Sequence, residues 1–144
     1  YVHGNEPSHQ SAFLYHWTDS PWKTQDKVRM ILKRMYHTGP SGLSGNDDMG
    51  QMSAWYVFNA LGFYPVCPGS DLYYFGSPSV VSAEIHLENG KTLIMKTVNQ
   101  SDKNVYIQKI TLNGKPIIHS FIKHSEIING GELIYFMGKK PKNK

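Results

Sequence analysis

The sequence is poor in features that would narrow its function. It has a single cysteine, Cys67, so no disulfide can form within the chain and the redox compartment stays open. No histidine stands beside Cys67 to activate it, and we therefore expect a buried structural thiol. No apolar run approaches the roughly 20 residues that a membrane-spanning helix needs. The first residue is not methionine, and we expect a piece cut from a longer protein.

Basic residues are also unevenly distributed along the sequence. Residues 1–72 hold five basic and six acidic side chains, whereas residues 73–144 hold ten and five. Four of those ten lysines fall in the last six residues, which predicts a solvated basic tail over 139–144. A nucleic-acid interface needs Lys and Arg clustered on one folded face, and no such stripe or motif is present. Nucleic acid is therefore not an expected partner.

Helical patterns fill the first half of the chain. Ser8 is a candidate N-cap for a short helix that runs to Trp17. Ser20 with Pro21 predicts the start of a second helix, which Gly39–Pro40 would end, because apolar residues recur at positions 28, 31, 32, 35 and 36. A third helix over 50–61 is apolar on nearly every face, so we expect it to be buried all round, with Gly62 as its C-terminal stop.

Strand patterns fill the second half. Short alternating or β-branched runs predict strands at 72–75, 80–87, 92–98, 106–112, 117–122 and 133–136. The pairs Asn89–Gly90, Asn113–Gly114 and Gly130–Gly131 are typical of hairpin turns. The predicted fold class is therefore α+β, with helices followed by an antiparallel sheet or half-sandwich.

The most informative stretch is Gly42–Tyr56, a glycine-rich loop with two adjacent carboxylates that enters the third helix. Asn46, Asp47 or Asp48 could cap the first free amides of that helix, where the helix dipole also favours negative charge. Alternatively, a carboxylate at a rigid helix entry beside glycines is well placed to act as a general base. Local chemistry leaves both interpretations open.

Several motifs in order resemble those of glycoside hydrolase family 92. They extend through Met137–Gly138 and so cover nearly the whole chain; the longest are His3–His9, Pro21–Gln25, Gly42–Phe58 and Leu61–Val66. Members of this family are calcium-dependent exo-α-mannosidases, often assigned to α-1,2 linkages, that invert the anomeric configuration. The resemblance implies an N-terminal β-sandwich and an (α/α)6 barrel. Residues 1–69 would then be the last barrel helices, 70–138 the strand region and 139–144 the tail.

The resemblance also assigns roles to individual residues. Asp48, assisted by Asp47 or Asn46, would be the general base that activates water, while the general acid lies on an earlier segment of the parent chain. Glu6 would be a Ca²⁺ ligand, helped by a backbone carbonyl near Gly4 or Asn5, which suits an ion that prefers oxygen ligands.

Two positions depart from the family pattern. Relatives carry a carboxylate where Asn46 stands, so Asp48 is the simpler choice for the base. Gln10 follows His9 where a second histidine is usual, which weakens a sugar or metal contact at that position; we keep Asn46 and His9 as substrate-binding candidates. The spacing of His3, His9 and His16 is a poor match for a zinc site.

A different class of function is also compatible with the sequence. The piece could be a non-catalytic carbohydrate-binding or structural module, with exposed strand aromatics such as Tyr73, Phe75 or Tyr135 forming a lectin-like surface. The expected partners are a mannose-containing glycan and the remainder of the parent chain. Family habit suggests a periplasmic, secreted or cell-surface location. Among the three tryptophans, Trp55 is the one we expect in the core because its neighbours are apolar.

Overall fold

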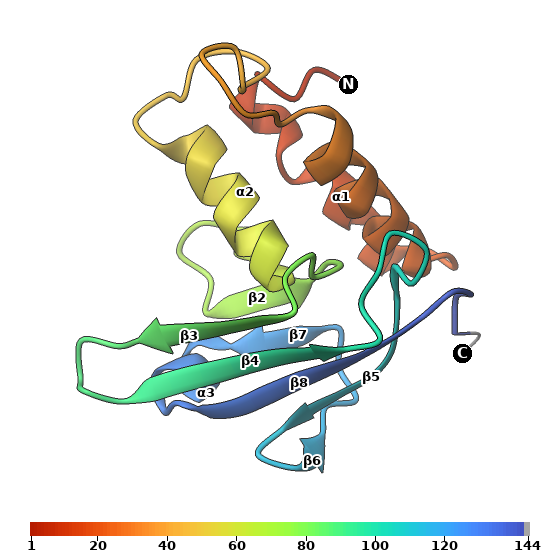
Figure 1. The fold of residues 1–144 in the computed structure, drawn as a ribbon, viewed down its shortest axis with the longest axis vertical. Coiled ribbons are helices and arrows are strands. Elements are labelled where there is room, and N and C mark those ends of the chain that lie inside the picture. Colours follow the sequence, from red (N-terminus) through yellow and green to blue (C-terminus); the bar gives the residue numbers. More distant parts are fainter. Residues whose placement is uncertain (143–144) are drawn as a thin grey trace.

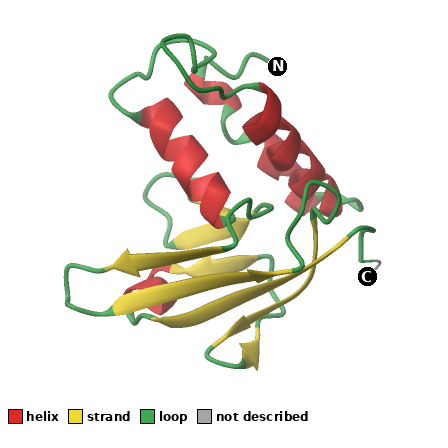
Figure 2. Ribbon diagram, in the orientation of Figure 1, coloured by secondary structure: helices red, strands yellow, loops and turns green. Residues whose placement is uncertain are grey.

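The computed structural model describes residues 1–142, in which a helical half lies over two sheets (Figures 1 and 2). The helical half holds two 3-10 helices, η1 (Glu6–Ser8) and η2 (Ser11–Trp17), and two longer helices, α1 (Trp22–Arg34) and α2 (Gln51–Leu61). The remaining elements are β1 (Phe63–Tyr64), β2 (Leu72–Phe75), β3 (Ser82–His86), β4 (Thr92–Val98), β5 (Tyr106–Leu112), β6 (Lys115–Pro116), β7 (Phe121–Lys123), α3 (His124–Ile128) and β8 (Gly131–Gly138). The α+β class predicted from the sequence is confirmed.

The first two helices differ from the prediction in their details. The expected helix from Ser8 to Trp17 is instead a pair of 3-10 helices, since the Pro7 ring and the tight turns before it favour short i→i+3 bonding. Helix α1 begins one residue later than expected, at Trp22, and no side chain caps it. It ends at Arg34, well before Gly39–Pro40, because the chain turns there into an antiparallel bridge between Tyr36 and Leu43.

Helix α2 and its glycine stop agree with the prediction. Gly62 takes the left-handed conformation at the C-cap, with φ of 98°, and its amide donates to carbonyls of the last turn. Trp55 is fully buried, as expected, and Tyr36 stacks parallel to it with ring centroids 6.0 Å apart. The outer face of α2 is not buried within residues 1–142, because Tyr56 and Val57 are exposed. The apolar residues of α2 are therefore only partly buried by residues 1–142.

Two sheets carry the second half of the chain. Strands β1, β2 and β7 form a small antiparallel sheet, and the larger sheet has the order β3-β4-β8-β5-β6. The turns at Asn89–Gly90 and Asn113–Gly114 join antiparallel neighbours as predicted. The larger sheet is not wholly antiparallel, because β4 and β8 pair in parallel; α3 lies between β7 and β8, so Gly130–Gly131 ends a helix and makes no hairpin.

The core has two connected parts. One lies in the sheets around Leu93, Leu133 and Tyr135, all fully buried, and the other lies between α1, α2 and η2 around Phe13 and Trp55. Arg29 of α1 crosses between them by donating to the carbonyls of Pro78 and Ser101. Packing of the helices on the sheet loops therefore depends on a buried cation as well as on apolar contacts.

Two smaller expectations are corrected. Cys67 is exposed, because it lies in the loop between β1 and β2, so the prediction of a buried thiol was wrong. The described part of the basic tail is not simply solvated: Gln108 donates to the Lys140 carbonyl at 2.9 Å and Lys142 donates to the Gln108 carbonyl at 3.1 Å. Residues 143–144 of that tail lie outside the described part. No helix within residues 1–142 has the length and apolar character to cross a membrane.

Candidate active site

Two loops meet in backbone contact at the end of the helical half. A Cβ atom added to Gly4 would lie 2.0 Å from the Ser44 carbonyl oxygen, and one added to Gly45 would lie 3.2 Å from the Cα of Gly4. No residue other than glycine allows such an approach from either side. The turn that contains Gly4, Asn5 and Glu6 therefore lies directly against the loop that precedes α2. That loop carries Asn46, Asp47 and Asp48 and is called the acidic loop below.

This contact brings two predicted site residues together. The carboxyl groups of Glu6 and Asp48, 42 positions apart in sequence, are within hydrogen-bond reach, so a protonated Asp48 can donate to the Glu6 carboxylate. That shared proton and the Glu6 charge raise the pKa of Asp48, while the same hydrogen bond lowers the pKa of Glu6. Asp48 is fully exposed to solvent, and its neighbours Asn46 and Asp47 are also exposed. A ligand can reach this pair.

The acidic loop has an unusual backbone where it presents Asp48. Asp48, Met49 and Gly50 have φ values of 48°, 56° and 89°, three left-handed residues in succession. Only the third is a glycine, and a left-handed non-glycine residue costs roughly 1–2 kcal/mol. Met49 is fully exposed, so its own packing does not select this conformation. This strained stretch lies directly between Asp47, which caps α2, and the first residue of α2.

Asp47 and Asp48 have separate roles as a result. The Asp47 carboxylate accepts from the Ser53 amide at 2.9 Å, and the Asp47 carbonyl accepts from the Met52 amide. Asp47 thus provides the helix-capping contact that the sequence predicted for this loop. The Asp48 side chain makes no such contact with the helix.

A buried polar layer lies behind the two loops. His3 and His9 are each only 2% exposed, and their rings lie 4.8 Å apart against Trp55. His9 bonds through Nε2 to the His3 carbonyl at 2.9 Å and through Nδ1 to Gln51 at 3.0 Å. Both ring nitrogens of His9 are therefore engaged inside the protein. A direct sugar contact by His9 stays a prediction.

The donors near Glu6 fit a hard cation better than zinc. Two carboxyl groups lie side by side, and the Asn5 carbonyl, which accepts one amide from Ser8 at 2.9 Å, has a second lone pair. Mixed carboxylate and carbonyl oxygens are the ligands that Ca²⁺ takes. Within residues 1–142 no three His, Cys, Asp or Glu side chains gather as a metal site. His16 is separate from the other histidines, because it bonds the Phe75 carbonyl.

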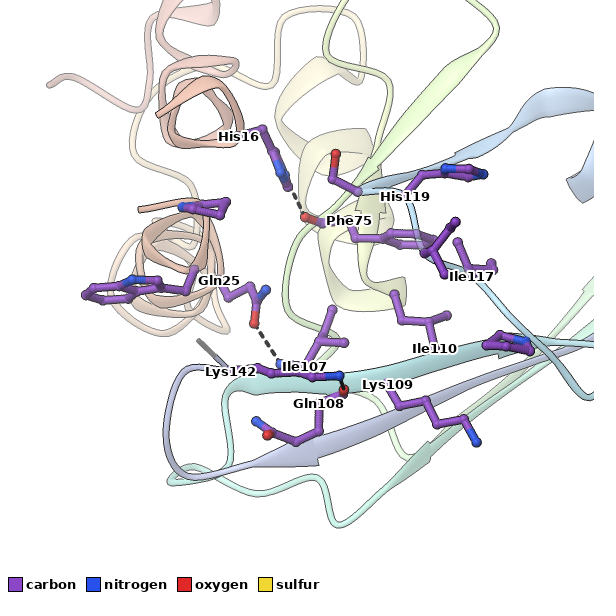
Figure 3. A pocket seen from close by; sticks show the side chains of 15 residues that line it. His16, Gln25, Phe75, Ile107, Gln108, Lys109, Ile110, Ile117, His119 and Lys142 are labelled. Atoms are coloured by element: carbon purple, nitrogen blue, oxygen red, sulfur yellow. Dashed lines mark hydrogen bonds between the residues drawn. The ribbon is translucent and has the colours of Figure 1, made fainter. Parts of the chain in front are cut away.

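An open cavity of about 570 Å³ lies elsewhere, between α1 and the sheets (Figure 3). His16 points across it to the Phe75 carbonyl, and Gln25 accepts from the Ile107 amide at 2.7 Å. No residue of the acidic loop or of the Asn5–Glu6 turn lines this cavity. It is therefore distinct from the carboxylate pair.

The strand aromatics do not form the lectin-like face considered from the sequence. Phe75 is 3% exposed and Tyr135 is fully buried, since both pack into the sheet core. Tyr73 is partly buried and stacks on His124. The alternation that suggested an outward face thus points these rings inward. Trp17 is the exposed tryptophan of the three.

Sequence reasoning missed the residues that join the two loops. Gln51 and Tyr36 link the N-terminal turn to α2, yet neither belongs to a motif that names a role. The available indication was the pair of glycines Gly4 and Gly45, each beside a functional residue, because glycine is favoured where backbones approach closely.

Comparisons with known proteins relate this chain to one family of enzymes. Residues 1–139 match the model of the glycosyl hydrolase family 92 catalytic domain. A protein named an uncharacterized secreted glycosidase, from Arthroderma benhamiae, is 36% identical over 95% of this chain and 18% of its own length.

Solved structures give the same family. The family GH92 α-mannosidase of Bacteroides thetaiotaomicron is 45% identical over 99% of this chain and 19% of its own, with a TM-score of 0.94. A family GH92 inverting mannosidase from the same organism is 40% identical over 99% and 19%, with a TM-score of 0.90. The chain spans about a fifth of the length of these relatives. It belongs to glycosyl hydrolase family 92 and forms part of that family's catalytic domain.

Proposed function

We propose that the full-length protein is a calcium-dependent, inverting exo-α-mannosidase that hydrolyses terminal α-mannosyl groups of glycans, with α-1,2 linkages as the expected preference. The observation that carries this proposal is the meeting of the half-buried Glu6 carboxyl with the exposed Asp48 carboxyl where the two loops touch. Support comes from relatives named as an α-mannosidase and as an inverting mannosidase. One of them has been solved in complex with mannoimidazole.

Asp48 is the general base in this proposal. Without a bound cation, the hydrogen bond with Glu6 and the Glu6 charge raise the pKa of Asp48 and favour its protonated form. Once ionised, the exposed Asp48 carboxylate can accept a proton from water. Asp47 stays in place as the helix cap and contributes negative charge beside Asp48. Asn46, exposed two residues before Asp48, has an amide that can orient the sugar or the water.

The calcium role belongs to the Asn5–Glu6 turn. Glu6 would supply a carboxylate oxygen, and Gly4 or Asn5 a backbone carbonyl oxygen. When bound, the ion would supply positive charge that holds the sugar hydroxyls and favours the ionised forms of nearby carboxyls. Glu6 would then no longer need a proton from Asp48, which frees Asp48 as a base.

An inverting hydrolase needs a second carboxyl on the far side of the glycosidic bond to act as acid. We assign that acid to another part of the parent chain, together with the N-terminal β-sandwich and the rest of the (α/α)6 barrel. Residues 1–69 would be barrel helices and 70–138 the strands that follow. The secreted relative suggests export to the periplasm, the cell surface or the medium.

The test is a matched pair of variants in the full-length protein, Asp48→Asn and Asp47→Asn, assayed on a mannosyl-α-1,2-mannose disaccharide with calcium and with a chelator. Asp48→Asn should lower kcat by about 10²–10⁴-fold, the usual contribution of a general base. Asp47→Asn keeps an oxygen that can accept from Ser53, so it should lose much less. Near-normal turnover in Asp48→Asn removes the base assignment. A parent that binds mannosides with no hydrolysis favours the carbohydrate-binding module instead.

A further inference from the structure

Two histidines, His3 and His9, connect the turn that carries Glu6 to the start of α2 by hydrogen bonds. The partners of each ring show which ring nitrogen carries the proton. The first chain begins at Tyr1, whose hydroxyl lies 2.7 Å from His3 Nδ1, and continues from His3 Nε2 to the Tyr36 hydroxyl at 2.6 Å. Tyr36 donates to the Met52 carbonyl at 3.0 Å, so it must accept from His3. His3 is therefore protonated on Nε2 and accepts from Tyr1 on Nδ1.

The second chain centres on His9. Its Nε2 contacts the His3 carbonyl, which can only accept, so the proton is on Nε2. Its Nδ1 therefore needs a donor, and the side-chain NH₂ of Gln51 lies 3.0 Å away. The second hydrogen of the same NH₂ group is donated to the Tyr64 hydroxyl at 3.0 Å. Both side-chain hydrogens of Gln51 are therefore used, one by His9 and one by Tyr64.

Gln51 is linked to the backbone of both residues of the carboxylate pair, directly to Asp48 and through His9 to Glu6. Its backbone amide donates to the Asp48 carbonyl at 3.2 Å. Its side chain holds His9, whose own amide donates to the Glu6 carbonyl at 2.9 Å. Trp55 adds a further contact from α2 by donating to the His9 carbonyl at 3.1 Å. Glu6, His9, Gln51 and Asp48 thus form a continuous set of hydrogen bonds.

We propose that Gln51 is a positioning residue that sets the spacing of the Glu6 and Asp48 carboxyl groups through His9. It does not touch the substrate. The inference rests on the proposed function, because the spacing matters if Glu6 binds calcium and Asp48 activates water. Residues that orient a metal ligand from behind typically change metal affinity about 10- to 100-fold when they are replaced.

The experiment compares Gln51→Met with wild type in the full-length protein. Methionine fills a similar volume and its side chain has no N–H donor, so His9 Nδ1 is left as a buried acceptor without a donor. We expect calcium affinity, measured by calorimetric titration, to fall about tenfold or more, with kcat falling rather than KM rising. We also expect faster hydrogen exchange of amides in residues 3–10, where the Ser8 and His9 amides are bonded within the turn.

Two control variants separate positioning from general stability. Tyr64→Phe removes the second partner of Gln51 and keeps the His9 bond, so its calcium affinity should stay within about twofold of wild type. Ile122→Val shortens a fully buried side chain in the sheet core and should lower Tm with unchanged calcium affinity and exchange in residues 3–10.

The outcomes are distinct. Wild type that neither binds calcium nor cleaves the mannoside overturns the proposed function and this inference together. A calcium-dependent wild type with equal calcium affinity and kcat in Gln51→Met overturns the inference alone. If Ile122→Val weakens calcium binding as much as Gln51→Met does, the effect is one of stability and the positioning role is likewise overturned.

Discussion

The loop pair that brings Glu6 to Asp48 and the five-stranded sheet are held together in different ways. The loop pair depends on two glycines in close backbone contact and on hydrogen bonds from buried histidines. The sheet depends on ladder pairing and on buried apolar side chains such as Leu93 and Leu133. The first is directional and its groups must meet in one geometry, whereas the second tolerates small shifts.

This difference matches the work that each region would do. A reacting pair of carboxyl groups must be held to a fraction of an ångström, which directional hydrogen bonds achieve. Apolar burial supplies free energy roughly in proportion to area, with no preferred direction. We therefore expect substitutions in the sheet to change stability most, and substitutions in the loop pair to change activity beyond their effect on stability.

The largest change in stability should come from Leu133→Ala. Leu133 is fully buried on β8, the strand between β4 and β5, so the substitution leaves a cavity in the sheet core. We expect the free energy of unfolding to fall by about 2–5 kcal/mol. Thermal or urea unfolding of the full-length protein measures it, and kcat per folded molecule should stay within about twofold. A selective loss of kcat at temperatures where the variant is folded would contradict the separation of the two regions.

A smaller change in stability but a larger one in activity should follow Gly4→Ala. The added Cβ would lie 2.0 Å from the Ser44 carbonyl, so the two loops must separate. Overpacking of this kind costs about 1–3 kcal/mol, and the Glu6–Asp48 contact should be lost with it. The measurements are unfolding free energy and kcat/KM on an α-mannoside.

Gly90→Ala is the matched control for Gly4→Ala. Gly90 has φ of 78° in the turn between β3 and β4, with nothing near its would-be Cβ. It should lose about 1 kcal/mol of stability from backbone strain alone and keep kcat/KM. Equal losses of activity in Gly4→Ala and Gly90→Ala would show that the loop contact has no special role.

Much of the fold could be predicted because its signals are local. The glycine stop at Gly62, the periodicity of α1 and the Asn-Gly turns each depend on a few neighbouring residues, and the structure agrees with them in substance. The parallel pairing of β4 with β8 could not be predicted, since strand direction depends on a connection that passes through β5, β6, β7 and α3. The burial of Phe75 and Tyr135 similarly depends on which face of each strand meets the other sheet, because the two rings contact each other between β2 and β8.

The candidate site shows the same limit. Family resemblance predicted Glu6 and Asp48 as separate site residues, and no residue pattern indicates that their carboxyl groups are in contact. The role of Gln51 could not be predicted either, because glutamine is common at the first position of a helix and its contact with His9 forms only in the folded chain. Long-range polar contacts of this kind depend on tertiary packing, which the residue pattern does not encode locally.

The pH dependence of stability offers the finest comparison of the two regions. His3 lies behind the loop pair, and His16 belongs to η2 and bonds the Phe75 carbonyl of β2. Burial lowers the pKa of each from 6.5 to about 4. Unfolded histidine binds a proton below pH 6.5 and the folded forms do not until about pH 4. Stability is therefore full above pH 6.5 and is lost as pH falls toward 4, by up to about 1.4 kcal/mol per pH unit for each histidine.

His16→Gln separates the contribution of His16 from that of His3. Glutamine can still donate to the Phe75 carbonyl, and it does not titrate. Of the residues that line the cavity with His16, the basic ones are Lys109, His119 and Lys142 and none carries a carboxylate, so no carboxylate there offsets protonation of His16. The slope of unfolding free energy against pH between 6.5 and 4 should fall by up to about 1.4 kcal/mol per pH unit in His16→Gln, while His3 continues to titrate. An unchanged slope would mean that His16 takes up no proton on unfolding, so that the acid sensitivity comes from other groups such as His3.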